Sequence, residues 1–269
     1  MPEIHPTAIV GDDVVLGDGV AVGPYSVISG DVEIGSGTAV HSHVVIGGRT
    51  RIGPDCEIYP FASIGLPPQD TKYRGEKSEL SVGARCRIRE YVTMNPGTEG
   101  GGMLTIVGDD CLFMVGAHVA HDCRVGSNVI LANNATLGGH VEIGDFAIIG
   151  GVSAIHQFVK IGAHAIVGGM SGVRQNVIPY GSAMGERAWL TGLNLVGMKR
   201  RDMAREEINA VRDAYRILFS EEGMLTERVQ KVVGKYENVG PIVSIIDFIQ
   251  QETSRAVLQP KSENGVSDS

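Results

Sequence analysis

The sequence is poor in aromatic residues, in cysteine and in long apolar runs. Only 5% of its 269 residues are Phe, Trp or Tyr, so the core must be built mainly from aliphatic side chains. No stretch approaches the roughly 20 apolar residues that a membrane-spanning helix needs. The start, MPEIHPTAIV, also lacks the basic region and apolar run of a secretory signal peptide. We therefore expect a protein with no membrane span.

Positive charge is scarce as well. The formal net charge is −8, which argues against nucleic acid or an anionic membrane as the main partner. The four cysteines (Cys56, Cys86, Cys111 and Cys123) show no CxxC spacing, and each stands where the repeat described below requires a small buried residue. This usage of cysteine fits a reducing, cytoplasmic compartment.

An apolar residue recurs at every sixth position through most of the chain. Neither a helix of period 3.6 nor a hairpin gives a strict six, so the period predicts a β-solenoid in which three hexads make one triangular coil of 18 residues. The recurring anchors fill a narrow interior, and the residue four positions after each one is therefore small or β-branched. The anchors are Val10, Leu16, Val22, Ile28, Ile34, Val40, Ile46, Ile52, Ile58, Ile64, Val82, Ile88, Met94, Val107, Phe113, Val119, Val125, Leu131, Leu137, Ile143, Ile149, Ile155, Ile161, Val167 and Val173.

Two insertions interrupt the period, at about residues 66–80 and 97–104. Proline and glycine punctuate the first and glycine dominates the second, which indicates two loops, the second of them mobile. The 163 residues between Val10 and Val173 include 12 and 7 extra residues at these loops, so 144 remain, or eight coils of 18. We assign residues 1–190 to a parallel β-helix with two inserted loops. The period does not set its handedness, and the usual crossover rule would favour a right-handed coil.

Residues 191–269 have a different composition. Apolar residues at helical spacing mark three amphipathic helices, at about 208–218, 225–233 and 241–249. A helical domain placed over the last coil would cover its open strand edges. The final stretch, from Leu258 to Ser269, is polar and is expected to be disordered.

Histidines gather on one face of the predicted coil. Residues 18 apart stack on successive coils, which places His121, His140 and the pair His156 and Gln157 on neighbouring layers, with His118 at the corner leading into them. None of them occupies an anchor position or the small position that follows it. Both loops leave the prism beside this face. Any one histidine alone is best interpreted as a surface or subunit contact, but the group favours a site between subunits.

The sequence also suggests a chemistry for this site. His121 precedes Asp122, a carboxylate that would orient the imidazole and stabilise its protonated form, so the ring can accept a proton from a hydroxyl near neutral pH. No serine or cysteine nucleophile accompanies it, which favours direct transfer over a covalent intermediate. The basic triplet Lys199-Arg200-Arg201 is either a solvated helix start or a contact for phosphate or an acidic carrier protein.

Several motifs carry a family resemblance. AHVAHD, LANNATLGGHV, AIIGG, IHQF, IGAH, VGG-SGV and the later N-x-x-G-x-KRR resemble the UDP-N-acetylglucosamine O-acyltransferases, which catalyse the first step of lipid A biosynthesis. The resemblance runs from His5 to about Phe248 and includes the loop GLPPQDTKYRGE. Hexads alone are unspecific, but AHVAHD together with LANNAT and the KRR-bearing helical end is highly specific.

The resemblance implies a fold and a reaction. The fold would be a left-handed parallel β-helix that assembles as a homotrimer, with active sites in clefts between neighbouring subunits. The reaction would transfer an (R)-3-hydroxyacyl group from acyl carrier protein to the 3-hydroxyl of UDP-N-acetylglucosamine. It would use no metal and no other cofactor.

The resemblance also assigns roles to residues. His121 would be the general base, Asp122 its orienting partner, and Gly139 the source of a backbone N–H for the oxyanion. Gly169 would lie where the family limits acyl-chain length. The sugar and acyl contacts would be Gln69, Asp70 and Lys72, the cleft lining His118, His140, His156 and Gln157, and the nucleotide contacts Asn194, Arg200 and Arg201.

Two residues depart from the family pattern. Val196 stands where an acidic residue is expected near the nucleotide, and Arg187 stands where histidine is common. Both departures bear on the contacts to uridine and phosphate rather than on the chemistry.

Three alternatives remain at this stage. A sibling enzyme N-acylates the amino sugar in a later step, but it carries an N-terminal nucleotide-binding domain for which the hexads leave no room. A γ-type carbonic anhydrase would hold zinc on three histidines, which His118, His121 and His140 could imitate. A non-catalytic trimeric scaffold would leave the histidine clustering unexplained.

Overall fold

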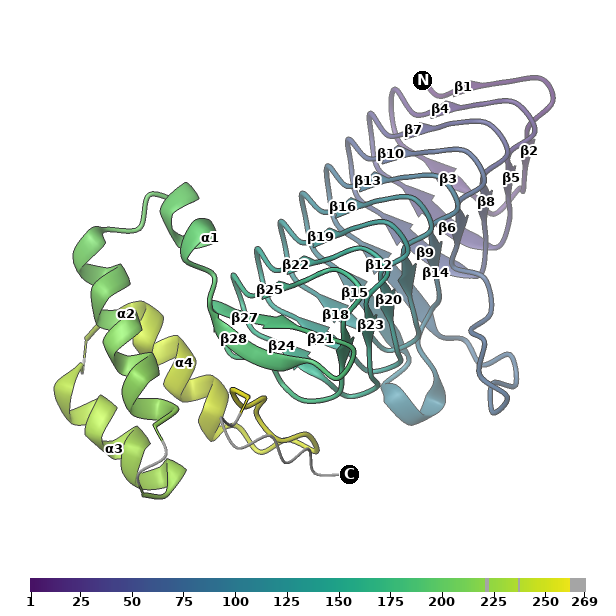
Figure 1. Cartoon of the computed structure of the whole chain (residues 1–269). Helices are drawn as coiled ribbons and strands as arrows, with labels where there is room; N and C mark the ends of the chain where they lie inside the picture. Colours follow the sequence, from purple (N-terminus) through teal and green to yellow (C-terminus); the bar gives the residue numbers. More distant parts are fainter. Residues whose placement is uncertain (221–222, 237, 262–269) are drawn as a thin grey trace.

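A computed structural model gives the structure of residues 1–220, 223–236 and 238–261. Figure 1 shows a three-sided prism of short strands that starts at the N-terminus, and a group of helices beyond its other end. Each side of the prism is a parallel sheet that takes one strand from every coil. Within the described part of the chain, no helix is long and apolar enough to cross a membrane.

The strands are mostly two residues long, because each hexad supplies one short strand and one corner. The eleven-stranded sheet contains β1 (Glu3–Ile4), β4 (Ala21–Val22), β7 (Ala39–Val40), β10 (Glu57–Ile58), β13 (Arg87–Ile88), β16 (Leu112–Phe113), β19 (Ile130–Leu131), β22 (Ile148–Ile149), β25 (Ile166–Val167), β27 (Gly181–Met184) and β28 (Trp189–Leu193). The nine-stranded sheet contains β2 (Ile9–Val10), β5 (Val27–Ile28), β8 (Val45–Ile46), β11 (Ser63–Ile64), β14 (Thr93–Met94), β17 (His118–Val119), β20 (Thr136–Leu137), β23 (Ala154–Ile155) and β26 (Gly172–Val173). The eight-stranded sheet contains β3 (Val15–Leu16), β6 (Asp31–Ile34), β9 (Arg49–Ile52), β12 (Glu79–Val82), β15 (Leu104–Val107), β18 (Arg124–Val125), β21 (Glu142–Ile143) and β24 (Lys160–Ile161).

The strand register confirms the β-solenoid and the positions of both insertions. Ile64 pairs with Met94, and Met94 pairs with Val119. The first step is therefore 30 residues and the second 25, which are 18 plus the 12 and 7 extra residues found in the sequence. The anchors from Val22 onward are buried, whereas Val10 and Leu16 on the first coil are partly exposed.

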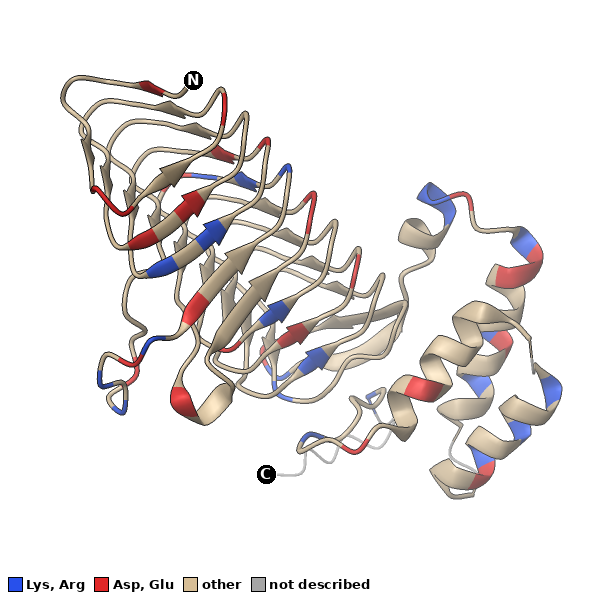
Figure 2. Ribbon diagram, turned by 180° about the vertical axis from the view of Figure 1, so that it is seen from behind, with Lys and Arg blue, Asp and Glu red and all other residues tan. Residues whose placement is uncertain are grey.

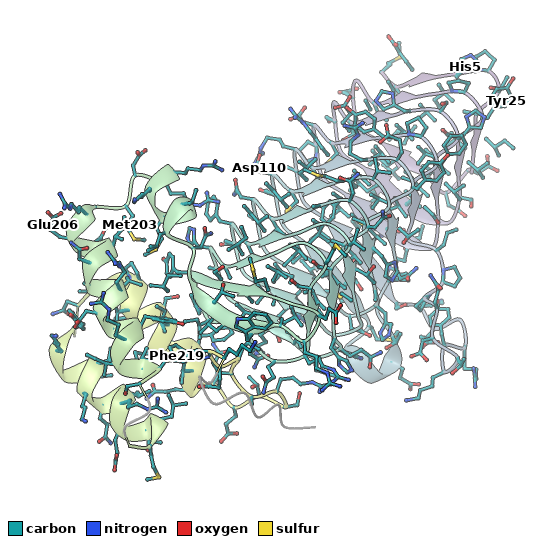
Figure 3. The ribbon with its side chains drawn as sticks, viewed as in Figure 1. His5, Tyr25, Asp110, Met203, Glu206 and Phe219 are labelled. Atoms are coloured by element: carbon teal, nitrogen blue, oxygen red, sulfur yellow. The ribbon has the colours of Figure 1, made fainter. Side chains whose placement is uncertain are left out.

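The corners of the prism require unusual backbone conformations. Non-glycine residues with positive φ recur there, among them Asp122 (φ 60°) and His140 (φ 62°). The loop corner, between the nine- and eight-stranded sheets, carries both insertions and these two residues. The helix corner joins the eight- and eleven-stranded sheets, and a third corner joins the eleven- and nine-stranded sheets, where Tyr25 projects outward (Figure 3).

The outer faces of the sheets differ in chemistry. Acidic and basic residues alternate across the eight-stranded sheet (Figure 2), for example Lys160 and Glu142, whose charged atoms lie 3.1 Å apart. The eleven-stranded sheet instead presents a column of aliphatic side chains that pair across successive coils. This aliphatic column consists of Leu112, Ile130, Ile148 and Ile166.

The last coil is closed by an antiparallel strand and followed by helices. β28 runs antiparallel to β27, and the chain then forms α1 (Leu195–Arg200), α2 (Arg205–Leu218), α3 (Leu225–Lys235) and α4 (Gly240–Gln250). These helices include the three that the sequence indicated. After α4 the chain returns to the prism, where the buried side chain of Leu258 and its N–H bond to the Asn176 carbonyl hold it. The remainder of the expected disordered tail, residues 262–269, lies outside the described residues.

Candidate active site

His121 and Asp122 form a hydrogen-bonded pair at the loop corner. The Nδ1 atom of His121 lies 2.8 Å from Oδ2 of Asp122, whose side chain is fully buried, while the side chain of His121 is 12% exposed. The positive φ of Asp122 turns its side chain back beneath the corner and toward the imidazole. A neutral imidazole that donates Nδ1–H to the carboxylate keeps an unprotonated Nε2, which is the arrangement of a general base.

His140 lies one coil further along and completes the cluster. Its Nδ1 atom is 4.0 Å from the same Asp122 oxygen, and its ring meets the ring of His121 edge to face with centroids 5.0 Å apart. Burial lowers the pKa of His140, an effect that the nearby charge of His121 reinforces and those of Asp122 and Asp70 oppose. His140 is therefore neutral at neutral pH, and Asp70 of the first loop lies close enough to act on it.

His118 occupies a strand position beside the pair. Its Nδ1 atom lies 2.6 Å from the Thr93 hydroxyl oxygen. Burial lowers the pKa of His118, and the charge of His121 lowers it further. A neutral His118 thus lies within electrostatic reach of His121, on the layer and face where the sequence placed it.

The second loop holds Asp122 in place. Thr98 donates its backbone N–H to both carboxylate oxygens, at 2.9 and 3.1 Å, and its hydroxyl to Oδ2 at 2.6 Å. The backbone N–H of Asp122 donates to the Thr105 hydroxyl at 2.8 Å. The loop that the sequence suggested to be mobile is therefore packed onto a buried carboxylate.

Gly139 faces the imidazole of His121. A Cβ atom built on Gly139 would lie 2.5 Å from Cε1 of that ring, so any side chain here would displace the imidazole. Within the described residues, the N–H of Gly139 donates to no protein acceptor. Gly139 therefore offers an open approach to His121 together with an available N–H.

The first loop brings its polar residues to the same corner. Asp70 accepts a hydrogen bond from the backbone N–H of Lys72 at 2.9 Å, which turns the chain, and the side chains of Gln69 and Lys72 are exposed. These residues are thus available for a ligand beside His140.

His156 and Gln157 stand one coil beyond His140, and the C-terminal segment reaches them. Arg255 donates Nη2–H to Nδ1 of His156 at 2.9 Å and Nε–H to the Gln157 carbonyl at 3.2 Å. His156 also lines a surface pocket together with Arg174 and Arg187. Arg187, one of the two departures from the family pattern, therefore lies beside the histidine face.

The expected nucleotide contacts lie elsewhere in this chain. Asn194 is buried at the helix corner, where its side chain donates to the His164 carbonyl and accepts from the Gly197 N–H at the start of α1. The guanidinium of Arg201 lies 4.1 Å from the Phe146 ring centroid at the same corner. Arg200 and Val196 are exposed on α1.

Gly169 lies on the third corner, next to Gly151 of the preceding coil. One chain therefore brings His118, His121, Asp122, Gly139, His140 and the first loop together. It does not bring Gly169 or the α1 residues to them.

Sequence reasoning missed three contacts of this site. Thr98 lies in an insertion, where the repeat gives no register, and Arg255 comes from the far end of the chain. Phe158, which stacks on His140, had a usable signal because it lies 18 residues after His140, the same step that aligned the histidines.

The cluster was also tested against a metal site. One ligand atom from each of His121, Asp122 and His140 lies within 4.8 Å of the others, and this is the only such group in the described residues. However, the Asp122 oxygens already accept bonds from the N–H and O–H of Thr98, and His121 lies at hydrogen-bonding distance. The donor set fits a hydrogen-bonded dyad, and the three-histidine group of a γ-type carbonic anhydrase does not form within one chain because His118 stands outside it.

Comparison with known proteins first defines the class. Residues 13–48 and 104–139 match the family of bacterial transferase hexapeptide repeats, which makes the prism a hexapeptide-repeat transferase fold. Residues 176–258 match the family described as UDP-N-acetylglucosamine O-acyltransferase, domain 2.

Relatives that span the whole chain define the family. The acyl-[acyl-carrier-protein]–UDP-N-acetylglucosamine O-acyltransferase of Bartonella henselae is 46% identical over 261 residues, which cover 97% of this chain and 95% of that protein. The protein of the same name from Paracoccus denitrificans is 49% identical over 205 residues, covering 76% and 77%. The structure of LpxA from Acinetobacter baumannii superposes with a TM-score of 0.92 at 40% identity, covering 95% of this chain and 99% of that one.

The chain belongs to the family of acyl-[acyl-carrier-protein]–UDP-N-acetylglucosamine O-acyltransferases, and it is an acyltransferase. The resemblance seen in the sequence and the left-handed parallel β-helix that it implied are confirmed. Family membership decides against the carbonic anhydrase, the later-step N-acyltransferase and the non-catalytic scaffold.

Proposed function

We propose that this chain transfers an (R)-3-hydroxyacyl group from acyl carrier protein to the 3-hydroxyl of UDP-N-acetylglucosamine, with His121 as general base. Transfer from acyl carrier protein to UDP-N-acetylglucosamine is the reaction in the names of its relatives. The observation that carries the assignment of the base is the 2.8 Å bond between His121 and the buried Asp122 carboxylate. That bond leaves Nε2 as the proton acceptor on the partly exposed side of the ring.

The proposed reaction is a direct acyl transfer. Nε2 of His121 takes the proton of the sugar hydroxyl as its oxygen attacks the thioester carbonyl, and Asp122 stabilises the resulting imidazolium. The Gly139 N–H donates to the oxyanion of the tetrahedral intermediate. The C–S bond then breaks, and the imidazolium returns its proton to the departing thiolate of the carrier's prosthetic group.

The remaining polar residues are assigned to substrate binding. Gln69, Asp70 and Lys72 on the first loop would contact the sugar or the acyl hydroxyl, because Asp70 already acts on His140. The face that carries these histidines would line the cleft. Its members are His118, His140, His156 and Gln157.

The nucleotide contacts are proposed to come from a second copy of the chain. Asn194, Arg200 and Arg201 lie at or beside the helix corner, whereas the dyad lies at the loop corner. Gly169, the proposed limit on acyl length, lies at the third corner. A single groove can use all three sets only if it runs between subunits, as in a homotrimer.

The surface chemistry supports this assembly. The aliphatic column on the eleven-stranded sheet is the surface that another subunit would cover, because a contiguous apolar column favours burial. The charged eight-stranded sheet would face solvent. A cytoplasmic location is proposed with it, because the four cysteines are free and buried, as expected of a reducing compartment.

The test is a transfer assay with purified protein. Acyl carrier proteins loaded with (R)-3-hydroxyacyl chains of graded length are supplied with UDP-N-acetylglucosamine or with its 3-amino analogue. Formation of the 3-O-acyl sugar nucleotide supports the proposal, and the absence of product at every chain length rejects it. Ile148→Glu should dissociate the assembly in light scattering, whereas Val233→Glu on exposed α3 should not, and a monomeric parent protein would reject the trimer.

A further inference from the structure

Thr98 is the main hydrogen-bond donor to the Asp122 carboxylate. Its backbone N–H and its hydroxyl make three contacts of 2.6–3.1 Å with the two carboxylate oxygens. Thr98 is 6% exposed and Asp122 is equally buried, so no solvent replaces these bonds. Hydrogen bonds to a buried charge rank among the stronger ones in proteins.

The second loop is shaped to approach this carboxylate. Cβ atoms built on Gly97 and Gly101, the glycines on either side of Thr98 and η1 (Glu99–Gly101), would overlap atoms of Asp122. Only residues without side chains allow the loop backbone so close. The insertion therefore does more than decorate the corner, because its backbone lies against the charged end of the dyad.

We propose that Thr98 is a positioning residue for the acyl transfer, acting on His121 through Asp122. This inference rests on the proposed function of His121 as base. Thr98 fixes the plane of the carboxylate so that Oδ2 faces Nδ1 of His121, which keeps the proton on Nδ1 and the lone pair on Nε2. Its hydroxyl also withdraws charge from Oδ2, which sets how strongly Asp122 stabilises the imidazolium.

The hydroxyl can be separated from the fold of the loop. Thr98→Ser keeps the O–H donor, whereas Thr98→Val replaces it with a methyl group of the same shape and keeps the backbone N–H. Thr38→Val is the matched control, because Thr38 is also fully buried and its hydroxyl donates to the Gly53 carbonyl, far from the dyad. Thr98→Ala serves as a second variant should the valine crowd the loop.

The expected result is a change in rate and in proton affinity. Thr98→Val should lower kcat about tenfold or more while KM for UDP-N-acetylglucosamine stays within about twofold, because Thr98 lies behind Asp122 and does not face the sugar. The more basic carboxylate should raise the pKa of His121, so the acidic limb of the kcat/KM profile should move up by about half a pH unit. Thr98→Ser and Thr38→Val should retain the parent profile.

A structural role alone would give a different result. Folded Thr98→Val and Thr98→Ala proteins with the parent kcat and pH profile would overturn the proposal, as would an equal loss in Thr98→Ser. Titration of isotope-labelled His121 by NMR measures the same pKa without turnover. A shift in that titration supports the role of Thr98 even if another base carries out the transfer, so the two proposals can fail separately.

Discussion

The ring of Phe158 lies parallel to the ring of His140, with centroids 4.4 Å apart and 5° between their planes. Both residues occupy the loop corner with positive φ, one coil apart, so the backbone of the repeat imposes the stack. The other contact of the His140 ring is the edge-to-face contact with His121. Phe158, which is 44% exposed, therefore fixes the orientation of a histidine in the catalytic cluster.

Removing this stack should weaken catalysis without unfolding the prism. Phe158→Ala is expected to lower kcat/KM by roughly 2- to 10-fold, the range of an aromatic pair, because His140 becomes free to rotate. Phe158→Tyr keeps the ring and should retain the parent value. Steady-state kinetics on both variants, with circular dichroism as the check on folding, measures the effect. Equal activity of Phe158→Ala and the parent would show that the stack has no catalytic role.

Replacing the proposed base should stop the reaction. His121→Ala is expected to reduce acyl transfer by at least about a thousandfold, because proton removal and the proton's return to the thiolate are both lost. Tyr91→Ala, an exposed ring on the third corner, is the control for loss of a surface side chain and should remain active. Appreciable turnover by a correctly assembled His121→Ala protein would reject His121 as base.

A side chain at position 169 should shorten the preferred acyl chain. A Cβ atom on Gly169 would lie 3.3 Å from the Gly151 carbonyl oxygen, so a substitution needs only a small adjustment. Gly169→Met should shift the preference in a chain-length series toward shorter acyl groups. Gly11→Met on the first coil, where the added Cβ meets nothing closer than 3.6 Å, should leave the profile unchanged. The same profile in both variants would refute the assignment of Gly169.

Mild acid should destabilise the protein through its buried histidines. Burial lowers the pKa of His118 and of His140 below the ordinary value of 6.5. The unfolded chain gains protons at these positions as the pH falls through about 6.5, while the folded chain does not. Stability that is fully present above this pH is therefore lost between about pH 7 and the folded pKa values. Thermal unfolding at stepwise lower pH should show a falling midpoint, with a smaller fall in His118→Gln, and parallel curves for the two proteins would contradict this.

The sequence carried enough information for the fold and for much of the site. A narrow three-sided interior forces each anchor to be apolar, so the hexads could be counted through two insertions and the pairing of Ile64 with Met94 and Met94 with Val119 followed. The same step of 18 brought His121 and His140 to one corner, where their rings touch. Local sterics thus fix both the coil and the stacking of its outward residues.

The remaining features depend on contacts that no period encodes. Thr98 reaches Asp122 from a loop whose path is set by three-dimensional packing, and Arg255 meets Gln157 across 98 residues of chain. The separation of Asn194 from the dyad follows from which corner α1 joins. Handedness also lay beyond the period, because a strict six fits either sense of coiling, and it came from the family.

The antiparallel β28 and the returning C-terminal segment seal one end of the prism, while the first coil keeps its strand edges unpaired. Head-to-tail polymerisation of a solenoid needs two adhesive ends on every molecule. With only one such end, two prisms can meet at their first coils but no filament of indefinite length can grow. The closing strand and tail thus keep a repeat that could stack without limit as a discrete particle.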